Sequence, residues 1–63
     1  MTIAEALAAL QRAGARFALA ELPDRPALAT LRHALEAAGF TEVGRVRDYM
    51  DDGTDLVLLR RNT

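Results

Sequence analysis

The absence of cysteine constrains this 63-residue chain more than any other feature of its sequence. A chain of this length buries only about 60% of the surface that it exposes when unfolded, so its hydrophobic core is small. Small domains commonly add disulfides, a structural metal or contacts between chains. Without cysteine there are no disulfides and no thiolate ligands, and the single histidine cannot hold a metal alone. A contact with another chain is therefore the expected additional support.

Charge and hydropathy exclude several classes of partner. Charges of both signs are spread along the chain, and the formal net charge is -1. This balance predicts no binding to nucleic acid and none to an anionic membrane. No apolar run approaches the ~20 residues that a transmembrane helix needs, and residues 1–11 lack the regions of a signal peptide. We expect one cytoplasmic domain covering residues 1–63.

Two segments have the periodicity of amphipathic helices. The first begins at Thr2, which forms the pattern of a capping box with Glu5, and it is expected to end at Gly14. The second follows Pro26, a residue that suits the first turn of a helix, and it is expected to end at Gly39. Both helices present leucine and alanine stripes that indicate core-facing sides.

Three segments are expected to form strands, namely residues 16–22, 42–50 and 55–61. The first is apolar on both faces, which is typical of a strand covered on both sides. The sequence Asp51-Asp52-Gly53-Thr54 predicts a turn, so the last two strands should form an antiparallel hairpin. The order is helix-strand-helix-strand-strand, which indicates an α/β (α+β) fold with a three-stranded mixed sheet. The two helices are expected on opposite faces or together on one.

Burial predicts the order of the strands. The segment 55–61 is the most apolar and should be central, whereas the charged segment 42–50 suits an exposed edge. The order is then first, third, second, which leaves the apolar segment at the other edge. Such an edge favours pairing with another chain, so we expect a homodimer or a complex with a partner chain. The residues of this dimer edge are Arg16, Phe17, Ala18, Leu19, Ala20, Glu21 and, where the segment ends, Leu22.

Three segments, 14–22, 35–40 and 47–55, carry a combined pattern. A strand is followed by a helix that ends in Gly39-Phe40, and then by a hairpin with Asp48-Tyr49 and an Asp-Gly turn. This pattern resembles the C-terminal half of the GNAT family of N-acetyltransferases, and the resemblance covers nearly the whole chain. It implies a GNAT-like half-domain, without the family's N-terminal strands.

The resemblance also bears on activity. The loop Leu22, Pro23, Asp24 and Arg25 would border the CoA arm and is the candidate cofactor-binding segment. The glycine-containing loop that binds the CoA pyrophosphate has no counterpart before the first helix. Leu35 stands where the family often has a tyrosine that acts as general acid, so no catalytic residue is assigned. We therefore expect no acetyltransferase activity from the chain alone, and no cofactor.

Two other functions remain open. If a second chain completed the site, acetyl-CoA would bind and the protein would be an N-acetyltransferase. A small regulatory or antitoxin-like interaction protein is the other alternative.

Isolated polar residues have structural interpretations beside functional ones. His33 is a candidate general base, but its place two positions from Leu31 and Leu35 favours the polar side of a helix. Arg45, Arg47 and Arg32 have the chemistry to bind an anion, although charged residues are also usual on an exposed edge strand. No metal site is predicted.

Overall fold

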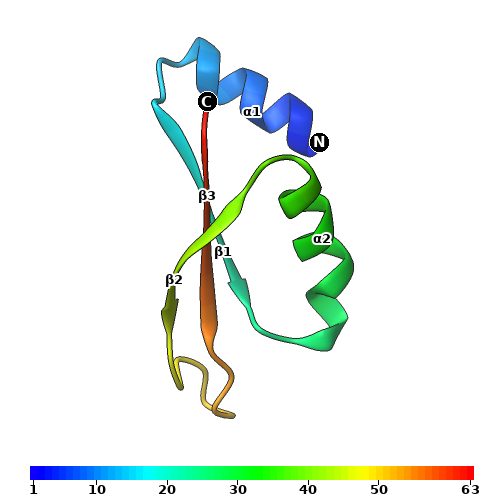
Figure 1. The fold of residues 1–63 in the computed structure, drawn as a ribbon, viewed down its shortest axis with the longest axis vertical. Coiled ribbons are helices and arrows are strands. Elements are labelled where there is room, and N and C mark those ends of the chain that lie inside the picture. The colour runs from blue at the N-terminus through cyan, green and yellow to red at the C-terminus, as the bar shows by residue number, and fades with distance from the viewer.

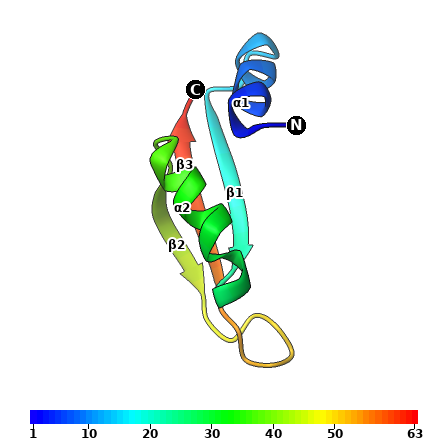
Figure 2. The same ribbon diagram turned by 90° about the vertical axis from the view of Figure 1, so that its right-hand side faces the viewer.

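The computed structural model describes all residues, 1–63. It contains, in chain order, α1 (Ile3–Arg12), β1 (Phe17–Pro23), the short 3-10 helix η1 (Pro26–Leu28), α2 (Ala29–Ala37), β2 (Thr41–Val46) and β3 (Leu56–Asn62). The molecule is elongated, with extents of 38 × 20 × 17 Å. Figure 1 shows both helices on the same side of the sheet, and Figure 2 shows α2 in front of it and α1 beside the upper end of β1. Neither helix has the length and apolar character that a membrane crossing requires.

The sheet has the predicted strand order, β1-β3-β2, with β3 in the centre. Both outer strands pair antiparallel to β3, so the prediction of a mixed sheet was wrong. The physical reason is the position of β3. The connection through α2 makes β1 and β2 run in the same direction, but β3 lies between them and no parallel ladder forms.

The predicted helix ends are confirmed. The Thr2 N–H donates to Glu5 Oε1 and the Glu5 N–H donates to Thr2 Oγ1, both at 3.1 Å, which completes the capping box. Gly14 and Gly39 follow the two helices with φ of 84° and 95°, a left-handed conformation that glycine adopts without steric cost. Pro26 begins a turn of 3-10 helix that leads directly into α2.

The core lies between the helices and one face of the sheet. The buried side chains form one cluster: Leu7, Ala18, Leu35, Phe40, Val57 and Leu59. The alternate residues of the strands face the other way, and no element covers them. We call this side the open face, and its side chains on β1 and β3 are those of Phe17, Leu19, Glu21, Pro23, Leu56, Leu58, Arg60 and Asn62. The expectation that β1 is covered on both sides was therefore wrong.

The paired part of the hairpin formed by β2 and β3 is shorter than the sequence predicts. β2 ends at Val46 rather than near residue 50, and the register shifts between Glu42 and Gly44, as in a β-bulge. The connection carries the predicted turn, with Gly53 at φ 84°. Tyr49 lies in this connection with 59% of its surface exposed, so it does not pack across the hairpin as an aromatic pair would.

Candidate functional site

The free edge of β1 follows from its register with β3. The Thr63 N–H donates to the Arg16 carbonyl at 3.2 Å, and the Asp24 N–H donates to the Asp55 carbonyl at 2.8 Å. Because hydrogen-bonded residues alternate along an antiparallel pair, the even-numbered residues of β1 bond to β3. The odd-numbered residues direct their backbone groups away from β3, where no strand lies. Those with both N–H and C=O free in this way are Phe17, Leu19 and Glu21.

The same residues place their side chains on the open face. Phe17 and Leu19 are 47% and 51% exposed, which is unusual for large apolar side chains on neighbouring positions of one strand face. Arg60 of β3 covers part of the Phe17 ring, with its guanidinium carbon 4.4 Å from the ring centroid. The edge therefore combines unpaired backbone groups with exposed apolar side chains. These residues fall within the segment 16–21 that the sequence assigned to a dimer edge, and contact with another chain stays a prediction.

A cavity of about 330 Å³ lies where β1 ends, against η1 and the start of α2. The candidate cofactor loop Leu22, Pro23, Asp24 and Arg25 lines it as one continuous wall, and Arg32 and His33 line another part. Two of its three basic side chains already have anionic partners: Arg25 pairs with Asp52 at 2.8 Å, and Arg32 pairs with Glu42 at 2.9 Å. Ligand binding by this loop stays a prediction.

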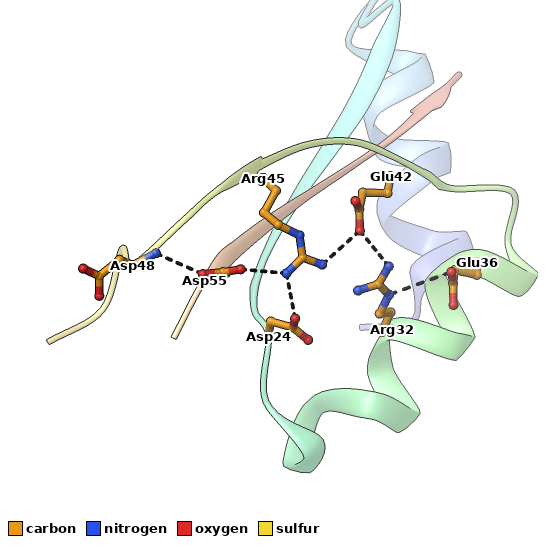
Figure 3. Close-up of polar contacts among 7 residues, drawn as sticks. All are labelled: Asp24, Arg32, Glu36, Glu42, Arg45, Asp48 and Asp55. Carbon is orange, nitrogen blue, oxygen red and sulfur yellow. Dashed lines mark hydrogen bonds and ion pairs between the residues drawn. The ribbon is translucent and has the colours of Figure 1, made fainter. Parts of the chain in front are cut away.

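Arg45 stands at the centre of an ion-pair network beside this cavity (Figure 3). Its Nη1 lies 2.8 Å from Asp24 Oδ2 and 3.0 Å from Asp55 Oδ2, and its Nη2 lies 3.4 Å from Glu42 Oε1. Glu42 also contacts Arg32 of α2, so the network joins β2 to α2 and to the adjoining ends of β1 and β3. Isolated surface pairs stabilise little, but here one guanidinium holds three segments together.

The electrostatics of the network favour the charged forms of Arg45 and Asp55. Hydrogen bonds to Asp24 and then to Asp55 raise the pKa of Arg45 further above its ordinary value. The backbone N–H of Asp48, followed by Arg45, lowers the pKa of Asp55 below its ordinary value. Neither group is suited to exchange a proton near neutral pH. The network is therefore a structural clamp, in which the charge of Arg45 is already paired with three carboxylates.

The start of α1 tests whether the CoA pyrophosphate fits, because the resemblance places that group at this helix N-terminus. The capping box occupies the backbone donor of Thr2 with the carboxylate of Glu5, which puts negative charge where a phosphate would sit. Leu35, in the place of the general acid, is 7% exposed within the core. The residues present at these two places do not fit the pyrophosphate or acid catalysis.

Sequence reasoning missed the network around Arg45. It placed this residue on a solvated edge strand, whereas the structure pairs it with three carboxylates. Only Glu42 is close to it in sequence. Asp24 and Asp55 lie close to Arg45 because β1 and β2 flank β3. The predicted strand order was therefore the one feature of the sequence that could have indicated these ion pairs. His33 is exposed on α2, which fits the polar-side interpretation.

Comparison with known proteins supports the fold. No protein-family model matches the sequence, and no curated protein matches it. A crystal structure of a protein assigned to the GNAT acetyltransferase family, from Desulfovibrio desulfuricans, matches 95% of this chain with a TM-score of 0.86 and 25% sequence identity. This chain spans 38% of that protein. The chain therefore has a partial GNAT-like α+β fold, with two helices on one three-stranded antiparallel sheet.

Proposed function

We propose that this chain is a strand-pairing module: a GNAT-like half-domain that binds another protein chain through the free edge of β1, without catalysing acetyl transfer on its own. The observation that carries the proposal is that unpaired backbone groups and exposed apolar side chains coincide at Phe17 and Leu19. Strand addition uses both, because main-chain hydrogen bonds supply affinity and alternate side chains supply specificity.

The exposed surface of the chain supports this proposal. Its accessible area is 4462 Å². A monomeric protein of 6.9 kDa is expected to expose about 4,000 Å². Only 6 of 63 residues are buried, so a chain added at the edge would contribute burial that the core lacks. Figure 2 shows α1 beside the upper end of β1 and beyond its free edge, so a strand added there would have α1 close to it.

The second half of the proposal, the lack of activity, is supported at two places. The N-terminus of α1 is closed by its own Glu5, and the buried Leu35 has no proton to give. Both are properties of the chain's own residues, so a partner would have to supply a phosphate-binding backbone and a general acid.

A strand peptide tests the proposed edge. The chain, labelled with ¹⁵N and kept at micromolar concentration, is titrated with a synthetic peptide carrying residues 16–22. The peptide is expected to shift the amide signals of Phe17, Leu19 and Glu21. Leu19→Pro removes an outward N–H that the ladder with β3 does not use, so it should abolish binding while the fold remains. Leu19→Ala keeps this donor and should only weaken binding. Undiminished binding by the proline variant, or no binding by the wild type, would overturn the proposal.

One observation favours the alternative, an N-acetyltransferase whose site is completed by a second chain. The cavity at the end of β1 is bordered by the loop that the resemblance assigns to the CoA arm. Calorimetric titration with acetyl-CoA, on the chain at a concentration where it self-associates, decides between the two. Micromolar binding would replace the non-catalytic proposal, and the absence of heat is the result we expect.

A further inference from the structure

We infer that the chain bound at this edge is a second copy of the same chain, paired antiparallel with Leu19 of one copy opposite Leu19 of the second copy. This inference rests on the proposed strand-pairing function, and it names the partner and the register. The pair is related by a twofold axis perpendicular to the sheet, the commonest symmetry of homodimers.

The register follows from the backbone groups that remain free. With Leu19 on the axis, Phe17 of each copy lies opposite Glu21 of the second copy. Each of these facing pairs exchanges both of its N–H and C=O groups, as in the hydrogen-bonded pairs of an antiparallel ladder. All the outward-facing donors at the edge are then used.

Neither neighbouring register does as well. A shift of one hydrogen-bonded pair in one direction sets Phe17 opposite Pro23, which has no N–H to donate. A shift in the other direction sets Glu21 opposite Ala15, whose N–H already donates to the Leu10 carbonyl at 2.9 Å. Each neighbouring register therefore contains pairs that can exchange at most one bond, whereas in the register centred on Leu19 the facing pairs formed by Phe17, Leu19 and Glu21 all exchange both.

Charge complementarity supports the same register. Glu21 and Arg60 both lie exposed on the open face, and neither makes an ion pair within its own chain. In the inferred dimer, Glu21 of the second copy lies opposite Phe17, and the guanidinium of Arg60 lies over that same ring. The symmetry forms this contact twice. Two charges that make no ion pair in the monomer thus face each other across the dimer.

Sedimentation equilibrium with charge reversal tests this arrangement, over concentrations from micromolar to millimolar. The wild-type chain should approach twice its monomer mass. Glu21→Arg and Arg60→Glu should each weaken dimerisation roughly tenfold, because two exposed contacts turn repulsive in each variant. The double variant restores opposite charges and should return to within about threefold of the wild type. Arg12→Glu, a reversal on exposed α1, is the matched control and should leave the equilibrium unchanged.

The outcomes separate this inference from the proposal beneath it. A chain that binds the strand peptide but stays monomeric at millimolar concentration retains the proposed function and overturns the second-copy partner. A dimer that the double variant fails to restore overturns the Leu19-centred register. A chain that neither dimerises nor binds the peptide overturns both. Rescue by the double variant, with Leu19→Pro monomeric, is the expected result.

Discussion

The guanidinium of Arg60 lies over the ring of Phe17, 4.4 Å from its centroid, on the sheet face that no helix covers. In the monomer this stacking screens part of an exposed aromatic ring from water. Exposed cation–π contacts stabilise by about 0.5–1 kcal/mol, and the planar guanidinium also packs flat on the ring. Arg60→Gln should therefore lower the free energy of unfolding by about that amount.

Urea unfolding checks this effect at a concentration where sedimentation shows the chain to be monomeric, so that association does not contribute. Arg47→Gln is the matched control, because Arg47 is exposed in the hairpin connection and contacts no ring. Equal losses in the two variants would show that the Arg60–Phe17 contact adds nothing to stability.

The left-handed glycines after the two helices allow a second prediction. A side chain at such a φ costs roughly 1–2 kcal/mol, so Gly14→Ala and Gly39→Ala should both destabilise the fold. A Cβ at position 14 meets nothing within 4 Å, whereas one at 39 would approach Arg61 Nε at 3.3 Å. Gly39→Ala should therefore lower the free energy of unfolding, as measured by urea unfolding, at least as much as Gly14→Ala does. A stabilised Gly39→Ala variant would contradict the left-handed helix end.

The centre of the core allows a third prediction. Leu59 is 0% exposed on the central strand, and its truncation would leave a cavity in a cluster of only six buried residues. Leu59→Ala should cost about 2–5 kcal/mol, enough to unfold much of a small domain. Leu31→Ala makes the same change on α2 at a residue that is 43% exposed, and it should cost far less. Circular dichroism and thermal unfolding distinguish the two, and similar melting temperatures would count against the described core.

Acid should weaken the contact between the hairpin connection and the loop after β1. Hydrogen bonds from the side chain and backbone of Thr54, and then from Arg25, lower the pKa of Asp52 to about 2. Its ordinary value is 3.8, so the folded state binds fewer protons than the unfolded state between these values. The contribution of Asp52 is complete above about pH 4 and is lost as the pH falls toward about pH 2.

Asp52→Asn should therefore lower the free energy of unfolding at neutral pH and make its decline below about pH 4 less steep. Urea unfolding at a series of pH values measures both effects. The same decline in the two proteins would mean that Asp52 is not held ionised by its neighbours.

The predictable parts of this fold are those that local chemistry decides. The capping box at Thr2, the glycine ends at positions 14 and 39, and the apolar central strand each depend on a few neighbouring residues. The antiparallel sheet was also implied by the predicted strand order, since a central β3 separates the two strands that run in the same direction. The prediction of a mixed sheet therefore contradicted the predicted strand order.

The parts that could not be predicted depend on distances between segments. Both faces of β1 are apolar in sequence, and only the placement of both helices on one side leaves Phe17 and Leu19 uncovered. The partners of Arg45 come from the ends of two other strands, so no local pattern indicates them. The candidate edge was found from sequence because it needs only strand order and hydropathy.

The bulge in β2 limits how far association could proceed. A regular strand at both edges would give each molecule two sites for growth, and copies could add without end into a fibre. The irregular register between Glu42 and Gly44 makes the β2 edge a poor template for pairing. With one usable edge, each copy can pair with only one other chain. In the inferred dimer, pairing through β1 would use this edge in both copies, and assembly would stop at two chains.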